Sequence, residues 1–138
     1  MDKVLITGTS CGVGKATAKK FLDKGYFVIG LDWKPATITH ENYAHYDCDV
    51  SDEDQLPDVD GIKYLVNNAG IVTPKADAIA VNQIGYINVI KKYGYDSALR
   101  SIVNVGSTAS IKGYDNLEYC PSQGASDAIT KWAANNFG

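Results

Sequence analysis

The sequence predicts an α/β fold in which a doubly wound parallel sheet of about five strands lies between two layers of helices. Short apolar runs with the composition of buried strands alternate with segments of helical spacing along nearly the whole chain. This alternation is typical of parallel sheets with crossover helices. Glycines and polar residues directly follow the apolar runs, and the carboxyl ends of parallel strands form the ligand-binding edge of such sheets.

Length and composition are those of one globular domain spanning residues 1–138. The chain is 45% hydrophobic and 21% charged, which argues against disorder. Its 13 basic and 16 acidic residues give a formal charge of −3, so it lacks the basic surface that nucleic acid or an anionic membrane requires. No apolar run approaches the ~20 residues of a membrane span. The N-terminus does not resemble a signal peptide, and three cysteines suit a reducing compartment, so we expect a cytoplasmic protein.

Residues 4–31 are predicted to form one strand–helix–strand unit. An apolar run at 4–7 predicts a buried strand, and helical spacing over 15–24 predicts a helix that Gly25 ends. A second apolar run at 27–31 completes the unit.

The same alternation continues through the rest of the chain. Strands are predicted at 44–49, 63–66 and 101–105, and long helices at 75–93 and 117–137. The acidic stretch between the third and fourth strands contains a proline, which leaves room for a turn or two of helix.

Both long helices have an apolar stripe that we expect to face the sheet. For the helix at 75–93 the stripe is Ile79, Asn82, Tyr86, Val89 and Ile90. For the helix at 117–137 it is Ala125, Ala128, Ile129, Trp132 and Ala133. Trp132 is therefore expected in the core, and Asp115 with Glu118 is expected to cap the last helix.

Every predicted strand ends on a residue of unusual character. The five end points are Gly8, Asp32, Asp49, Asn67 and Ser107. Because carboxyl ends of parallel strands share one edge, these residues are expected on one rim of the sheet.

The segment 7–14, Thr-Gly-Thr-Ser-Cys-Gly-Val-Gly, joins the first strand to the first helix. Glycine lets the backbone approach a pyrophosphate closely, and the following helix start supplies free N–H groups. An ordinary tight turn uses the same residues, so the turn alone does not decide. Asp32, 18 residues after Gly14, adds the acid that binds ribose hydroxyls in dinucleotide sites and repels a 2′-phosphate. NAD is therefore favoured over NADP, although Lys15 and Lys34 partly offset the acid, and a solvated loop acid is the alternative reading.

Taken together, the ordered motifs resemble those of the short-chain dehydrogenase/reductase family over nearly the whole chain. They are the glycine-rich turn, Asp32, Asp49-Val50, Asn67-Asn68-Ala69-Gly70, Asn82, Ser107 and Tyr119. The 12-residue spacing from Ser107 to Tyr119 is also typical of that family. The resemblance implies a Rossmann-like fold and an NAD(P)-dependent oxidoreductase that interconverts an alcohol and a carbonyl by hydride transfer.

The resemblance also implies which residues hold the cofactor. Gly8, Gly12 and Gly14 are expected under the pyrophosphate, with contacts from Ser10, Cys11 and Val13. Asp32 and Trp33 are expected at the adenosine ribose, and Asp49 and Val50 at the adenine ring. Asn68, Ala69 and Gly70 are expected along the middle of the cofactor.

Four further residues correspond to the family's catalytic positions. Ser107 is expected to bind the substrate oxygen, Tyr119 to transfer the proton, and Asn82 to bend its helix and hold a relay water. An ordinary tyrosine hydroxyl is scarcely ionised at pH 7, so it needs a nearby positive charge to act as a base. The family supplies a lysine one helical turn later, where this chain has Gln123. A cation about 5 Å away stabilises a phenolate by about 3 kcal/mol at an effective dielectric near 20, so we expect impaired catalysis.

A second departure from the family is the end of the chain, and it leaves alternatives open. The chain stops where a sixth strand is expected, which leaves the fifth strand as an exposed apolar edge and removes the family's substrate-binding segment. We therefore expect a homo-oligomer, formed through the helices at 75–93 and 117–137 or through that edge. A catalytically silent NAD-binding module and an assembly module are the alternatives to a dehydrogenase acting on a small alcohol or ketone. His40 and His45 have no companions at metal-ligand spacing, so no metal is expected.

Overall fold

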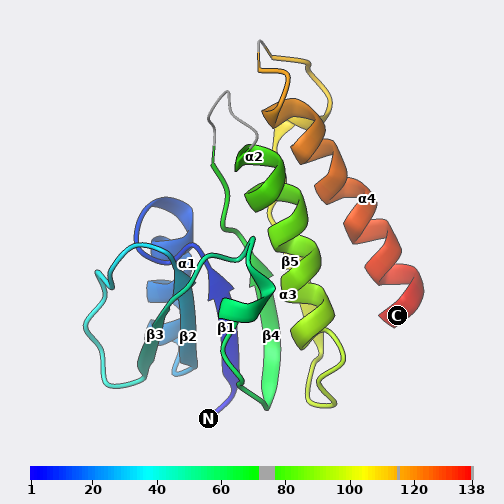
Figure 1. The fold of residues 1–138 in the computed structure, drawn as a ribbon. Coiled ribbons are helices and arrows are strands. Elements are labelled where there is room, and N and C mark those ends of the chain that lie inside the picture. The colour runs from blue at the N-terminus through cyan, green and yellow to red at the C-terminus, as the bar shows by residue number, and fades with distance from the viewer. Residues whose placement is uncertain (72–76, 115, 138) are drawn as a thin grey trace.

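A five-stranded parallel sheet organises the chain in this computed structural model, which describes residues 1–71, 77–114 and 116–137 (Figure 1). The strands are β1 (Lys3–Thr7), β2 (Phe27–Asp32), β3 (Tyr43–Asp47), β4 (Ile62–Asn67) and β5 (Ser101–Asn104). They lie in the order β3-β2-β1-β4-β5, and every neighbouring pair is parallel. The predicted doubly wound fold is thereby confirmed.

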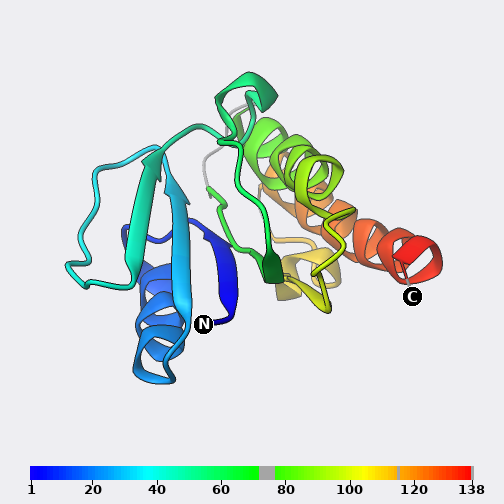
Figure 2. The ribbon, with the colours of Figure 1, turned by 90° about the horizontal axis from the view of Figure 1, so that it is seen from below.

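Helices cover both faces of this sheet (Figure 2). One face carries α1 (Gly12–Asp23). The other carries α2 (Asp77–Ile79), the π-helical turn η2 (Ala80–Gly85), α3 (Tyr86–Tyr93) and α4 (Tyr119–Phe137). Two short 3-10 turns, η1 (Glu53–Gln55) and η3 (Thr108–Ser110), lie in the connections.

The alternation of side chains along the strands divides the core into two clusters. On the α1 side, Val4 and Ile6 pack with Ala18 and Leu22 of the helix. On the other side, Leu5 and Leu65 belong to the cluster that includes the buried face of α3, whose members are Val89, Ile90 and Tyr93. The central strand β1 therefore contributes alternate residues to both clusters.

Strand β5 forms one edge of the described sheet. Its Val103 side chain is 52% exposed, as the sequence led us to expect of an apolar edge. The oligomer inferred from that edge stays a prediction.

The inward face of α4 differs from the expected stripe. Trp132 is 48% exposed and packs edge-on against Phe137 instead of entering the core. Ala128 is exposed as well. The buried residues of α4 are Ser122, Gln123, Ser126 and Ala133. Within the expected stripe, Ala133 is buried and Ile129 packs against the core. The spacing of apolar residues therefore predicted the inward face only in part, because polar residues complete it.

The expected continuous helix at 75–93 is broken. Residues 75 and 76 lie outside the described residues, and a π-helical turn separates α2 from α3. Ile79, expected to face inward, is 42% exposed, whereas Asn82 and Tyr86 are buried as predicted. Because a π turn adds a residue, it shifts the helical phase along the segment.

Helix α4 begins at Tyr119, two residues later than expected. The Tyr119 backbone N–H donates to the Asn116 side-chain oxygen at 2.8 Å, so Asn116 caps α4. Asp115 of the expected capping pair lies outside the described residues.

None of the described helices is both long and apolar enough to cross a bilayer. Within the same part of the chain, no three His, Cys, Asp or Glu side chains are grouped so that they can hold a metal ion.

Gly30, in the middle of β2, provides a test of the packing. A Cβ there would lie 2.2 Å from the Tyr43 hydroxyl and 2.5 Å from Thr9 Oγ1. We expect Gly30→Ala to lower the free energy of unfolding by about 1–3 kcal/mol, the usual cost of overpacking, as measured by urea denaturation. Gly124→Ala is the matched control, because no heavy atom lies within 4 Å of its added Cβ and alanine favours a helix. Equal stability of the two variants would contradict the packing described.

Candidate functional site

A cavity of about 280 Å³ opens at the carboxyl ends of the central strands. Eleven of the thirteen residues expected at the cofactor line it: Gly8, Cys11, Gly12, Val13, Asp32, Trp33, Asp49, Val50, Asn68, Ala69 and Gly70. Five further residues complete the wall: Leu31, Lys34, Cys48, Ile71 and Val81. One cavity thus collects residues from four separate motifs of the sequence.

The glycine-rich turn forms the floor of the cavity because three chain segments meet there at very short range. Gly8 has φ of +79°, a left-handed conformation that glycine adopts without strain. A Cβ on Gly14 would lie 2.0 Å from the Gly8 carbonyl oxygen and 2.4 Å from the Asn68 amide nitrogen. Gly14 therefore permits helix α1 to start directly against β1 and the end of β4.

Helix α1 begins at this floor with its first amides uncapped. Its N-cap residue, Cys11, makes no side-chain capping hydrogen bond. The first N–H groups of a helix have no partner within the helix, and they carry the positive end of its dipole. Gly12 and Val13 line the cavity and are exposed. The arrangement fits an anionic group such as a pyrophosphate.

Ser10 and Gly14, also expected at the cofactor, do not line the cavity. Ser10 is buried, and its hydroxyl donates to the carbonyl oxygens of Lys34 (3.2 Å) and Pro35 (2.9 Å). The Thr37 hydroxyl donates back to the Ser10 carbonyl at 2.6 Å. In this structure Ser10 ties the turn to the loop after β2.

Asp32 lies at the end of β2 with only 8% of its surface exposed. One carboxylate oxygen accepts the Ser10 backbone N–H, and the other accepts the Lys34 backbone N–H, both at 2.9 Å. A carboxylate oxygen accepts more than one hydrogen bond. Asp32 is therefore held in place and still offers acceptor sites to the cavity that it lines.

The far wall of the cavity is partly apolar. Val50 is buried, while Trp33 is 58% exposed beside the opening. Asp49 is half-buried, and one of its oxygens already accepts the backbone N–H and the hydroxyl of Ser51. Burial, reinforced by the Asp49 carboxylate, raises the pKa of Cys48 to about 11, so the thiol is neutral near pH 7. A flat, largely uncharged group fits between these side chains.

The end of β4 is joined to the end of β1 by a residue that the sequence analysis missed. Thr7 Oγ1 accepts the backbone N–H groups of Asn68 (2.9 Å) and Ala69 (2.8 Å). The Asn68 amide donates to the Thr7 carbonyl at 3.0 Å. Thr7 directly precedes the glycine turn, and a threonine hydroxyl is a known partner of backbone groups, but its partners are 61 residues away.

Asn82 lies at the other end of the Asn68–Ile71 segment. Its side-chain oxygen accepts the Ile71 N–H, and its amide donates to the Ile71 carbonyl, both at 2.8 Å. The same amide also donates to Ser122 Oγ of α4 at 3.2 Å. Asn82 is fully buried and lies within the π-helical turn. The expectation that it bends its helix to hold a relay water stays a prediction.

Tyr119 and Gln123 lie on the first turns of α4. Tyr119 is half-buried, and its carbonyl accepts the Ser122 hydroxyl at 2.6 Å. Burial, and secondarily the nearby Tyr119 phenol, raises the pKa of Tyr86. Tyr86 is thus a neutral donor to the Val105 carbonyl at 2.8 Å. Gln123 lies one turn after Tyr119, is only 6% exposed and carries no charge.

Ser107 follows β5 and begins the short turn η3, which packs against α4. Its hydroxyl oxygen accepts the Ala109 backbone N–H at 3.1 Å. None of the four expected catalytic residues lines the 280 Å³ cavity. Asn82 is connected to it through Ile71, and the intervening residues 72–76 lie outside the described part of the chain.

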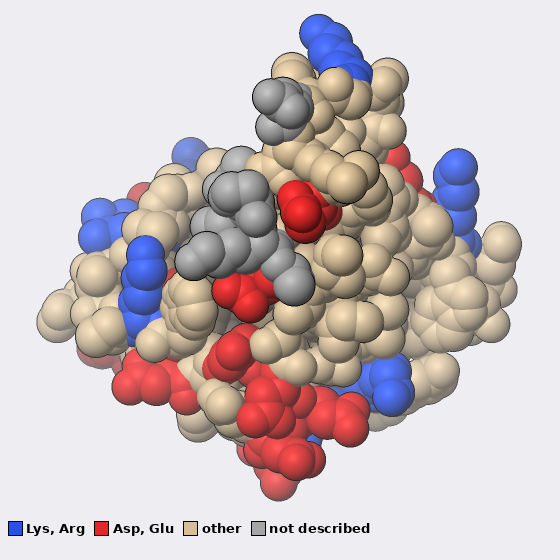
Figure 3. Space-filling model, turned by 45° about the horizontal axis from the view of Figure 1, so that its top comes forward, with Lys and Arg blue, Asp and Glu red and all other residues tan. Residues whose placement is uncertain are grey.

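Charged side chains are unevenly distributed over the face shown in Figure 3. In this view acidic side chains gather toward the lower border, while Lys and Arg are dispersed. The connection from β3 to β4 supplies a run of exposed acids: Asp52, Glu53, Asp54, Asp58 and Asp60. The face shown in Figure 3 offers no continuous basic surface of the kind that binds nucleic acid.

Comparison with known proteins gives a consistent result. The family model described as short chain dehydrogenase matches residues 2–138. A benzil reductase of Bacillus subtilis (strain 168), which forms (S)-benzoin, is 26% identical over 159 aligned positions that cover 95% of this chain and 65% of the relative.

Solved structures have the same fold. Ligand-free aldohexose dehydrogenase from Thermoplasma acidophilum matches with a TM-score of 0.85 and 29% identity over 99% of this chain and 62% of its own. The protein ElxO with NADP bound matches with a TM-score of 0.84 and 26% identity over 99% and 68%. The chain thus spans less than two thirds of the benzil reductase and of the aldohexose dehydrogenase.

The Asn82 contacts predict a large effect of its removal. Asn82→Ala leaves the half-buried Ile71 backbone N–H and C=O without their partners, and an unpaired buried polar group costs about 1–3 kcal/mol. We expect the free energy of unfolding to fall by about 2–4 kcal/mol in urea denaturation. Asn135, exposed on α4, is the matched control, and Asn135→Ala is expected to change stability by less than about 0.5 kcal/mol. Similar values for the two variants would refute the assigned role.

Proposed function

The chain belongs to the short-chain dehydrogenase family, a family of NAD(P)-dependent oxidoreductases, and on that premise we propose that it binds NAD and interconverts a small alcohol and a carbonyl compound. The observation that carries the proposal is the single cavity into which the glycine turn, Asp32, Asp49-Val50 and Asn68–Gly70 converge. The uncapped start of α1 and the close approach at Gly14 fit a diphosphate. The nicotinamide cofactor, when bound, supplies the hydride chemistry.

Each part of the cavity has one role in this proposal. The amides of the turn and of the first residues of α1 bind the pyrophosphate. Asp32 accepts hydrogen bonds from the adenosine ribose, and Val50 packs against the adenine. Ala69 and Gly70 lie along the middle of the cofactor, where their small side chains leave room.

NAD is proposed over NADP because Asp32 is an ionisable acid fixed in the cavity wall. Its two backbone hydrogen bonds hold the carboxylate in place, and a carboxylate repels a 2′-phosphate. Lys34 also lines the cavity and offsets part of that repulsion. ElxO, a relative with the same fold, binds NADP, so the fold alone does not favour NAD and the proposed preference depends on the side chains present here.

For the proton, we assign Ser107 to the substrate oxygen and Tyr119 to proton transfer. Ser107 lies between β5 and η3, and Tyr119 is the first residue of α4. The two residues are placed on neighbouring elements because η3 packs against α4. Gln123 lies one turn after Tyr119 and is buried, and its amide is able to donate hydrogen bonds but supplies no charge. Loss of the positive charge leaves the phenolate of the base without its electrostatic support, so turnover is expected to be low.

A catalytically silent dinucleotide-binding module is the second candidate. The buried, neutral Gln123 favours it, because this position affects the proton step more than binding. The two candidates share the cavity and differ in turnover.

Asp32 provides the test of binding. We expect calorimetry to show NAD binding to the wild-type chain, with Asp32→Asn shifting the NAD-to-NADP affinity ratio about tenfold toward NADP, since repulsion of the 2′-phosphate is lost. Asp54→Asn removes the same charge from an exposed turn and is expected to leave the ratio unchanged. A flat titration of folded wild-type protein with both dinucleotides would reject both candidate functions.

Gln123 provides the test of catalysis. Gln123→Lys is expected to raise turnover of alcohols or ketones about tenfold to a hundredfold, because a cation near the base is worth about 3 kcal/mol at most. Initial rates are measured by absorbance of the reduced cofactor. Gln123→Met is the uncharged control and is expected to give no gain. If the lysine variant binds NAD and gains no activity over a substrate panel, the silent module is the better description.

A further inference from the structure

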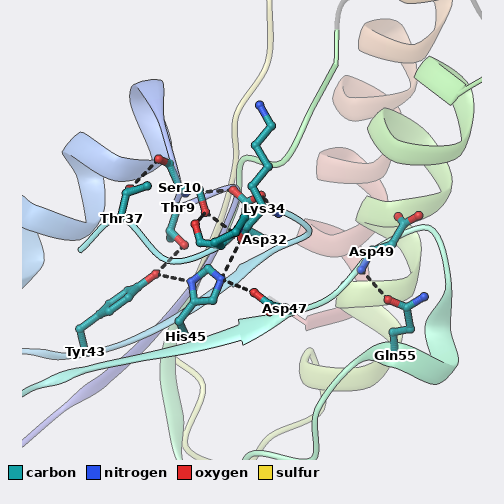
Figure 4. Close-up of polar contacts among 11 residues, drawn as sticks. Thr9, Ser10, Asp32, Lys34, Thr37, Tyr43, His45, Asp47, Asp49 and Gln55 are labelled. Atoms are coloured by element: carbon teal, nitrogen blue, oxygen red, sulfur yellow. Dashed lines mark hydrogen bonds and ion pairs between the residues drawn. The ribbon is translucent and has the colours of Figure 1, made fainter. Parts of the chain in front are cut away.

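A chain of polar contacts runs from the glycine-rich turn to strand β3, outside the roles assigned above (Figure 4). Thr9 Oγ1 lies 2.8 Å from the Tyr43 hydroxyl, which lies 2.9 Å from His45 Nδ1. On the other side of the ring, His45 Nε2 lies 3.0 Å from the Lys34 carbonyl oxygen and 3.0 Å from Asp47 Oδ1. His45 therefore links the turn after β1 to the loop after β2.

This arrangement is built into the sheet. Tyr43 and His45 are two residues apart on β3, so they point to the same face. The register places His45 opposite Gly30, and the missing side chain of Gly30 makes room for the Tyr43 and Thr9 hydroxyls. Thr9 is fully buried, and the His45 side chain is only 10% exposed.

The partners determine which His45 nitrogen carries the proton in the neutral ring. The Lys34 carbonyl and the Asp47 carboxylate only accept, so Nε2 must donate. Nδ1 then accepts the Tyr43 hydroxyl, and the Tyr43 oxygen accepts the Thr9 hydroxyl. Burial raises the pKa of Tyr43, which keeps that hydroxyl protonated as a donor. Each group in this series of contacts thus has a hydrogen-bond partner, and the donors all point from Thr9 toward Lys34 and Asp47.

The backbone of Lys34 connects this series of contacts to Asp32. The Lys34 carbonyl accepts from His45 and from the Ser10 hydroxyl. The Lys34 N–H donates to Asp32 Oδ1 at 2.9 Å. The carbonyl belongs to the Lys34–Pro35 peptide group and the N–H to the Trp33–Lys34 peptide group, and the two groups are joined at the Lys34 Cα. Contacts to the carbonyl therefore restrict the Lys34 backbone whose N–H orients the carboxylate.

We propose that His45 is a positioning residue for nucleotide selectivity, which restricts the backbone of Lys34 through its carbonyl and so helps to fix the Asp32 carboxylate at the ribose end of the cavity. The inference rests on the proposed function, because it takes the adenosine half of the dinucleotide to lie beside Asp32. A carboxylate that is fixed beside the ribose repels a 2′-phosphate, because it cannot rotate away from the phosphate charge. When the Lys34 backbone is released, the Asp32 carboxylate turns more freely, and the protein discriminates less between NAD and NADP.

The experiment compares three variants by calorimetric titration with NAD and with NADP. His45→Ala is expected to weaken NAD binding about threefold to tenfold, the loss of one net hydrogen bond, and to shift the NAD-to-NADP ratio toward NADP by a similar factor. His45→Gln is expected to restore the wild-type ratio, because its amide N–H reaches the Lys34 carbonyl as Nε2 does. His40→Ala is the matched control, since His40 is exposed and, among the described residues, its ring accepts only the Asn42 backbone N–H.

The outcomes separate this inference from the proposed function. Wild-type protein that binds neither dinucleotide overturns both. Wild-type protein that binds, with His45→Ala showing an unchanged ratio, overturns the positioning role and leaves the proposed function standing. If His45→Ala does not fold, His45→Asn replaces it, because the shorter asparagine keeps the amide but falls short of the Lys34 carbonyl. Equal ratios for the asparagine and glutamine variants then overturn the proposal.

Discussion

The close meeting of β1, α1 and β4 at Gly8, Gly14 and Asn68 is the constraint on which the site depends. The backbone of α1 starts so near the end of β1 that a single Cβ at Gly14 would overlap the Gly8 carbonyl. Thr7 and Asn68 then join the ends of β1 and β4 by hydrogen bonds. Because three backbones converge there, the turn presents main-chain amides, rather than side chains, to the cavity.

A second constraint is the polar interface between α4 and its neighbours. Asn82, Ser122 and Tyr119 are linked by hydrogen bonds between the π-helical turn and the start of α4. Buried polar groups stabilise a structure only when paired, so this interface fixes the position of α4 more narrowly than an apolar one. That position places Tyr119 and Gln123 relative to β5, and the proposed chemistry depends on it.

The loop after β2 shows how distant residues control a binding surface. Ser10, Thr37 and His45 all bond to its backbone or to the turn beside it. Asp32 receives its orientation from two amides that these contacts hold. The orientation of the Asp32 carboxylate is therefore a property of three segments acting together.

The sequence by itself determined the parallel α/β fold and the candidate cofactor cavity, because strand periodicity, the glycine turn and the acids after strands are local patterns with direct backbone consequences. It did not determine the inward face of α4, where Trp132 turned outward, nor the π turn that moved Ile79 to the surface. It also gave no sign of the Thr7 and His45 contacts. Those features depend on pairing between residues far apart in the chain, and only the packed tertiary structure decides such pairs.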